Sequence, residues 1–143
     1  MSNEPVTRGY VVGPGEGVPG RGPEIKASGR STGGSLTVLE ATIDGGPPRH
    51  THEREDESFD VLTGSLDVAC GEDRFHAGPG SLVFLPRNLP HFFRSVGGPA
   101  TALLIVTPGG LDEYFAELSA ALAANADSAQ PRTIQQAYGI TRS

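Results

Sequence analysis

Residues 50–57 read HTHEREDE, and the interpretation of the whole chain starts from this stretch. His50 and His52 are two residues apart, so both side chains lie on one face if the segment is an extended strand. Two imidazoles on one face can bind a single metal ion from one side. The pair follows the Gly- and Pro-rich residues 45–48, which predict a turn just before the strand.

Glu57 begins the next predicted strand and shares its face with Phe59 and Val61. If these two apolar residues belong to the core, the Glu57 carboxylate points inward, where an isolated charge is costly. A divalent metal beside the histidine pair would stabilise that carboxylate. Glu55 and Asp56 are weaker candidates, because Glu55 lies in a hydrophilic loop and Asp56 has the opposite strand parity.

His91 is the fourth candidate ligand, and it comes from a separate strand. It follows a turn at residues 88–90 and precedes two phenylalanines, which places a polar ring at the start of an apolar strand. Three imidazoles and one carboxylate suit Fe(II), Mn(II), Ni(II), Cu(II) or Zn(II). Such a set leaves one or two coordination positions open, as in catalytic metal sites. The remaining histidine, His76, is predicted not to be a ligand.

The strand pattern extends over most of the chain. Its 143 residues include 20 glycines and 12 prolines, a balance that favours many short strands joined by turns within one domain. Eight or nine strands are expected at residues 24–107, and the run at residues 102–106 is apolar enough for a strand buried on both sides. Residues 1–23 lack any helical period and are expected to form an irregular arm.

A helical pattern replaces the strands in residues 108–143. One face of a predicted helix carries apolar side chains at helical spacing: Leu111, Tyr114, Phe115, Leu118 and Leu122. A second short helix is predicted over residues 132–138, with a proline near its start and a glycine just after its end. Both helices are interpreted as packing elements.

Composition excludes some classes of function. The net charge of −6 argues against a nucleic-acid-binding protein, because no basic stripe is available to contact phosphates. Cys70 is the only cysteine, so an intramolecular disulfide is impossible. The start of the sequence has no continuous apolar run, so neither a signal peptide nor a membrane span is predicted, and the expected location is the cytoplasm.

Two stretches of the chain resemble the paired motifs of the cupin superfamily. Residues 45–64 are similar to the first motif and residues 80–95 to the second, with matching type and spacing at His50, His52, Glu57, Gly64, Gly80, Pro86 and His91. Asn88 stands where the motif has a glycine, although asparagine tolerates the same positive φ. Ser95 replaces an asparagine, and the first glycine is one residue nearer the histidines. The resemblance implies an all-β, double-stranded β-helix (jelly-roll) barrel with one metal ion in its mouth.

The resemblance also suggests an activity. Residues 107–115 and the C-terminal residues are similar to small cupins of the quercetin-dioxygenase-like group, and cupins resembling this chain include aromatic polyketide cyclases. Apolar residues near the predicted site suggest a cavity for a small aromatic or enol-containing substrate: Phe59, Val61, Phe84 and Phe93. The leading hypothesis is a dioxygenase with Glu57 as the base. A Lewis-acid cyclase or isomerase and a non-catalytic binding protein remain alternatives. Cupins of this kind commonly pair, so a homodimer is also expected.

Overall fold

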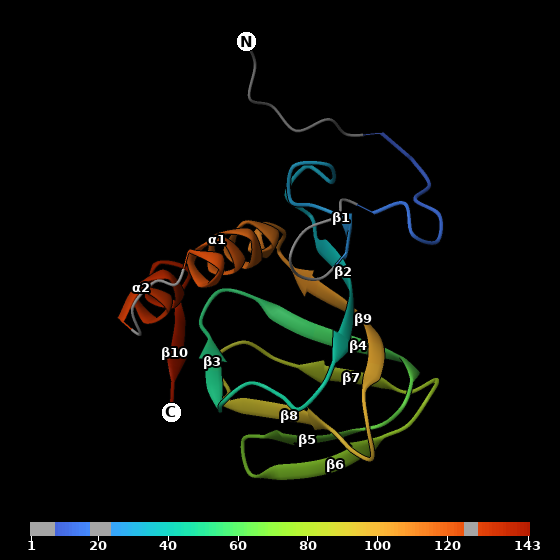
Figure 1. The fold of residues 1–143 in the computed structure, drawn as a ribbon, viewed down its shortest axis with the longest axis vertical. Helices are drawn as coiled ribbons and strands as arrows, with labels where there is room; N and C mark the ends of the chain where they lie inside the picture. Colours follow the sequence, from blue (N-terminus) through green and yellow to red (C-terminus); the bar gives the residue numbers. More distant parts are fainter. Residues whose placement is uncertain (1–7, 18–23, 125–128) are drawn as a thin grey trace.

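The computed structural model describes residues 8–17, 24–124 and 129–143 (Figure 1). The predicted N-terminal arm is therefore described only in part, because residues 1–7 and 18–23 lie outside the described residues. Residues 8–17 have no helix or strand, as predicted for that part of the arm. They contact the first strand, since Lys26 Nζ donates a hydrogen bond of 2.9 Å to the carbonyl of Gly13.

Ten strands in the described part of the chain form two five-stranded sheets in which every paired neighbour is antiparallel. The first sheet has the order β1-β2-β9-β4-β7, with β1 (Glu24–Ala27), β2 (Thr37–Ile43), β4 (Asp56–Thr63), β7 (Leu82–Leu85) and β9 (Ala100–Thr107). The second has the order β10-β3-β8-β5-β6, with β3 (His50–His52), β5 (Leu66–Cys70), β6 (Asp73–Ala77), β8 (His91–Ser95) and β10 (Ile140–Arg142). The non-sequential neighbours and the antiparallel pairing are those of a double-stranded β-helix, which confirms the predicted fold class.

The core lies between the two sheets and follows the strand period of two. In β9, Ala100, Ala102, Leu104 and Val106 are buried, whereas the residues between them are only half-buried. The prediction that this strand is buried on both sides was therefore wrong. An antiparallel sheet of a barrel has one inner and one outer face, so even a continuous apolar run buries alternate residues most deeply.

Helix α1 (Leu111–Ala123) matches the predicted apolar face at its start. Leu111 and Tyr114 are buried, but Leu122, at the other end of the face, is 60% exposed. The Asp112 carboxylate anchors the first turn, because its Oδ1 accepts hydrogen bonds from the Gly29 N–H (3.0 Å) and the Thr37 hydroxyl (2.8 Å). The helix is thereby tied to β2 of the first sheet.

The last segment of the chain differs from the prediction. Helix α2 (Ala129–Ala137) begins three residues before the predicted start, and the chain then forms β10, which the sequence did not predict. This strand pairs with β3, so the end of the chain lies beside the histidine pair (Figure 1). Within the described ranges, neither α1 nor α2 is sufficiently long and apolar to cross a membrane.

Candidate metal centre

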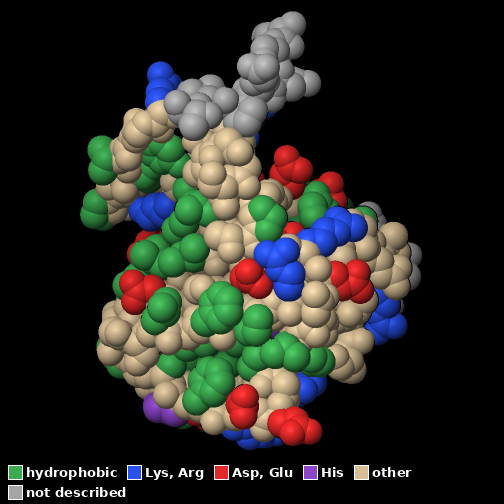
Figure 2. All heavy atoms as spheres, turned by 180° about the vertical axis from the view of Figure 1, so that it is seen from behind, with side chains coloured by type: hydrophobic (Ala, Val, Ile, Leu, Met, Phe, Trp, Pro, Cys, Tyr) green, Lys and Arg blue, Asp and Glu red, His purple; other side chains and the backbone are tan. Residues whose placement is uncertain are grey.

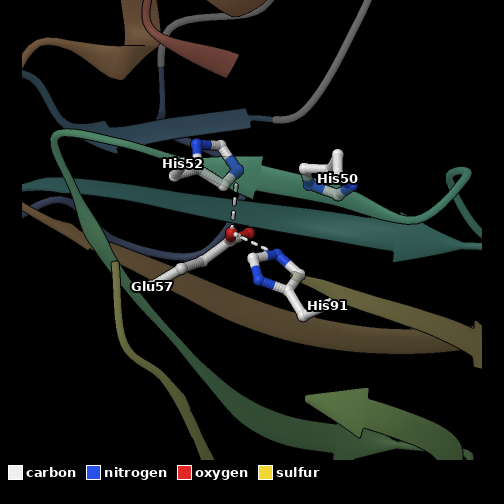
Figure 3. Close-up of side chains that lie close together, drawn as sticks. All are labelled: His50, His52, Glu57 and His91. Carbon is white, nitrogen blue, oxygen red and sulfur yellow. Dashed lines mark ion pairs between the residues drawn. The ribbon is translucent and has the colours of Figure 1, made fainter. Parts of the chain in front are cut away.

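Three strands bring the four candidate ligands together. His50 and His52 lie on β3, Glu57 on β4 and His91 at the start of β8, where it pairs with His50 across the sheet. One potential ligand atom from each of the four residues lies within 4.8 Å of the others. The Glu57 carboxylate lies between the rings of His52 and His91, with His50 to one side (Figure 3).

The turn before β8 joins two of these strands. Asn88 has a φ of 69°, which is the left-handed conformation. This conformation is expected at a position where the motif has a glycine. Its backbone N–H donates a hydrogen bond of 2.8 Å to the carbonyl of His52. The turn therefore holds the end of β3 close to the strand that supplies His91.

The centre is deeply buried on one side and open on the other. His91, Glu57 and His52 are only 1%, 3% and 5% exposed, whereas His50 is half-buried. His50 Nδ1 lies 2.7 Å from the carbonyl oxygen of Pro48, which can only accept a hydrogen bond. Nδ1 therefore carries the proton, and the neutral ring leaves the lone pair of Nε2 available to a metal.

Several buried polar atoms of the centre lack a hydrogen-bond partner among the described residues. Glu57 Oε2 lies 3.2 Å from His52 Nε2 and 3.4 Å from His91 Nε2, but neither contact forms a hydrogen bond. Both ring nitrogens of His91 also lack a partner. Burying such groups unpaired is costly, whereas one cation could bind the Glu57 oxygen and one ring nitrogen of His91 together. Three imidazoles, a carboxylate and these converging atoms fit one divalent metal ion.

Burial and neighbouring charges shift the pKa values of three candidate ligands. Burial alone would raise the pKa of the Glu57 carboxyl, but His52 and His91 outweigh burial and hold that pKa well below its usual range. Burial disfavours the charged form of His52, but the carboxylates of Glu55 and Glu57 raise the pKa of His52 to about 9. For the more distant His50, burial dominates and lowers the pKa to about 4. Excess negative charge is thus concentrated around His52 and Glu57.

Glu55 is a member of this centre that the sequence analysis undervalued. It was placed in a hydrophilic loop, yet it is only 9% exposed, and its Oε1 lies 3.8 Å from His52 Nδ1. The carboxylate therefore faces the ring nitrogen of His52 that points away from Glu57. Its position three residues after His52 was the one available signal, but spacing alone could not show that the loop folds inward.

The other candidate ligands lie elsewhere. The Asp56 carboxylate accepts hydrogen bonds from Arg87 on the surface, as its opposite strand parity predicted. His76 is exposed on β6 and pairs with Asp67 at 2.9 Å, outside the ligand group. Both residues are therefore kept from the centre by the strand faces that they occupy.

A cavity of about 570 Å³ opens onto the ligands. Apolar side chains form most of its wall: Ala41, Ile43, Pro47, Pro48, Phe59, Phe93, Leu104, Phe115, Leu118, Leu122, Pro131 and Ile140. Phe59 and Phe93, two of the residues proposed as lining from the sequence, lie in this wall with ring centroids 4.5 Å apart.

Two of the predicted lining residues do not reach this cavity. Val61 is buried in the core, two positions farther along β4 than Phe59. Phe84 is 56% exposed on β7, because its neighbours Val83 and Leu85 occupy the inner face. The sequence of β7 is apolar throughout, so its pattern could not distinguish the inner from the outer face.

Known proteins resemble this chain in one domain and in the fold. Residues 39–106 match the family model described as a cupin domain. A comparison with curated proteins gives no match. Among solved structures, KdgF from Halomonas sp. is similar with a TM-score of 0.56 and 21% sequence identity, over 63% of this chain and 80% of that one.

Two further solved structures have similar folds. The TT1209 protein from Thermus thermophilus has a TM-score of 0.51 and 25% identity, over 60% of this chain and 79% of its own. A cupin-2 domain containing protein from Shewanella frigidimarina has a TM-score of 0.50 and 20% identity, over 60% and 78%. The chain is therefore similar to cupin domains over residues 39–106, and these solved structures share its fold.

Proposed function

We propose that this protein is a metal-dependent cupin enzyme acting on a small substrate that has an apolar body and an enol or phenol oxygen, and that its reaction is a dioxygenation. One observation carries the proposal: three of the four clustered candidate ligands, His50, His52 and Glu57, line a cavity of about 570 Å³ whose wall is mostly apolar. A site with open coordination positions beside an apolar cavity suits catalysis better than structural metal binding.

The residues of the centre have distinct roles in this proposal. His50, His52 and His91 would hold a divalent ion, which would supply an electrophilic position for a substrate oxygen. Glu57 is proposed for a second task, the acceptance of the proton of an enol or phenol, because it is the one carboxylate of the ligand cluster and lines the cavity. The phenylalanine pair, Phe59 and Phe93, excludes water from the substrate body.

Metal content and oxygen consumption provide the first test. Protein as purified is expected to contain one transition metal ion per chain by mass spectrometry. An oxygen electrode is then used to screen flavonols and simpler phenols. Oxygen uptake that depends on the metal supports dioxygenation. Conversion without oxygen uptake would instead favour a Lewis-acid cyclase or isomerase, and saturable binding without any product would favour a binding protein.

Glu57→Gln tests the role of the carboxylate. The amide keeps the size of the side chain and an oxygen ligand but cannot accept the proton, so turnover per bound metal should fall by roughly a hundredfold or more. Glu53→Gln is the matched control, since Glu53 is exposed and does not line the cavity. Equal turnover per bound metal in wild type and Glu57→Gln would exclude Glu57 as the base.

We also propose that the chain forms a homodimer. Large apolar side chains are exposed on β4 and β7 of the first sheet: Leu62 at 38%, Leu82 at 71% and Phe84 at 56%. Figure 2 shows hydrophobic side chains gathered on the face turned away from the viewer in Figure 1. Such a patch favours association with a partner. A light-scattering mass near 14.9 kDa, that of one chain, at micromolar concentration would reject the dimer.

A further inference from the structure

The C-terminal segment contributes three polar side chains to a cavity wall that is mostly apolar outside the candidate ligands. Tyr114 of α1, Gln135 of α2 and Arg142 of β10 all line the cavity that opens onto the candidate ligands. Arg142 is the only arginine or lysine among the described residues of this wall. The proposed reaction at the ligand cluster assigns no role to these three residues.

The strand register places Arg142 beside the ligands. In the antiparallel pair of β10 and β3, Ile140 is opposite His52 and Arg142 is opposite His50. Directly opposed residues of such a pair project from the same face of the sheet and have neighbouring side chains. Arg142 therefore projects from the face that carries His50, at the less buried side of the centre.

Hydrogen bonds orient these polar side chains and leave donors available. Arg142 Nε donates to Gln135 Oε1 at 3.1 Å, and Gln135 Nε2 donates to the Tyr114 hydroxyl oxygen at 3.4 Å. Burial raises the pKa of Tyr114, so its hydroxyl keeps its proton near neutral pH. No carboxylate in the described ranges forms an ion pair with Arg142. The terminal guanidinium nitrogens and the Tyr114 hydroxyl can thus both donate to an acceptor in the cavity.

We propose that Arg142 binds a carboxylate of the substrate, so that the molecule acted on is a small organic acid with an apolar or aromatic body. This inference rests on the proposed function, because it assumes that the substrate occupies the cavity beside the ligands. The guanidinium presents two parallel N–H donors to the carboxylate, while the phenol or enol oxygen lies at the ligand cluster. Gln135 positions the guanidinium through its hydrogen bond to Nε.

The test compares two probes that differ in charge and little in shape, para-hydroxyphenylpropionate and its primary amide. Their dissociation constants are measured by calorimetry with metal-loaded wild type and with the metal-loaded Arg142→Ala variant. Wild type should bind the acid about tenfold or more tightly than the amide, since hydrogen bonds to charged groups are the stronger ones. Arg142→Ala should remove this preference while the affinity for the amide changes little.

Two controls test whether the preference for the acid comes from Arg142 or from another positive charge. Arg94→Ala removes an exposed arginine of β8 that does not line the cavity, and it should keep the preference for the acid. Because a metal ion also attracts carboxylates, the measurement is repeated on metal-free wild type and metal-free Arg142→Ala. A preference that survives in metal-free wild type and disappears in metal-free Arg142→Ala supports Arg142, even if no dioxygenation is found.

Other outcomes would overturn the proposal. An equal preference for the acid in Arg142→Ala and wild type would mean that another group binds the carboxylate. Equal affinity of wild type for the two probes would mean that the cavity does not select acids. Neither result depends on oxygen consumption or turnover, so the failure of this inference is distinguishable from failure of the proposed reaction.

Discussion

The two ends of the barrel interior bury different kinds of side chain. At the ligand end, His52, Glu57 and His91 are almost completely buried, and five side-chain atoms of the centre, including Glu55 Oε1, lack a hydrogen-bond partner in the described structure. At the other end, the residues on the same inner faces of β4 and β5 are Val61 and Leu66, both at most 1% exposed.

The two kinds of burial have opposite effects on the stability of the fold. Apolar burial at the far end stabilises the fold by roughly 25 cal/mol for each Å² removed from water. Unpaired polar burial at the ligand end costs free energy, and apolar residues in its place would pack without that cost. The polar burial at the ligand end is therefore not explained by stability, and substitutions at the two ends should have different effects.

The largest effect on stability is expected from Leu66→Ala at the far end. Leu66 is fully buried, so the substitution removes packed methyl groups and should lower the free energy of unfolding by about 2–5 kcal/mol. Metal bound per folded chain should not change. Urea denaturation and mass spectrometry measure the two quantities. Leu62→Ala, on the outer face of β4, should cost far less, and an equal loss would contradict the assignment of the core.

His52→Ala, at the ligand end, should weaken metal binding and leave the fold intact. Removal of a buried ligand should weaken metal binding on the order of a hundredfold or more, while the metal-free variant stays folded. Metal titration and circular dichroism measure the two properties. His76→Ala is the control, because His76 is exposed, pairs with Asp67 and lies outside the ligand cluster. Unchanged metal affinity in His52→Ala would remove the basis for the metal centre.

Glu55→Gln tests a smaller contribution from outside the ligand set. Glu55 faces His52 Nδ1 across 3.8 Å, a distance at which the carboxylate attracts the ring proton and makes Nε2 a better ligand. The amide lacks that charge, so metal affinity should fall by about tenfold. Glu53→Gln should leave the affinity unchanged. If both variants bind metal as wild type does, Glu55 has no part in the centre.

The dependence of metal affinity on pH should be the most gradual effect. In the metal-free protein the pKa of His52 is raised to about 9, so a metal ion must displace a proton from this ring at neutral pH. Affinity should therefore increase as pH rises from 7 toward 9, by up to about tenfold per unit, and the contribution of His52 should level off above that pKa. Competition with a chelator of known pH dependence measures the slope. A flat profile would contradict a protonated His52.

Much of the fold and the ligand cluster could be predicted because both rest on local rules. The alternation of side chains along a strand is fixed by backbone geometry, so His50 and His52 share a face wherever the strand lies. The same rule predicted that Phe59 shares a strand face with Glu57 and that Asp56 lies on the opposite face. The helical spacing that begins at Leu111 likewise predicted α1.

Burial and long-range pairing could not be predicted in this way. Strand parity states which residues share a face, but not which face is covered, so Phe84 was assigned to the cavity and is in fact exposed. Glu55 belongs to a charged loop whose sequence resembles a solvated surface, and only its packing against β3 makes it buried.

By itself, then, the sequence determined the strand period, the helix and the four residues whose types and spacings suit a metal. Only the tertiary structure decided that β10 returns to pair with β3 and brings Arg142 beside His50, although these residues are far apart in the chain. The physical reason is that side-chain alternation depends on neighbouring residues alone, whereas the pairing of distant strands depends on the free energy of the whole packed chain.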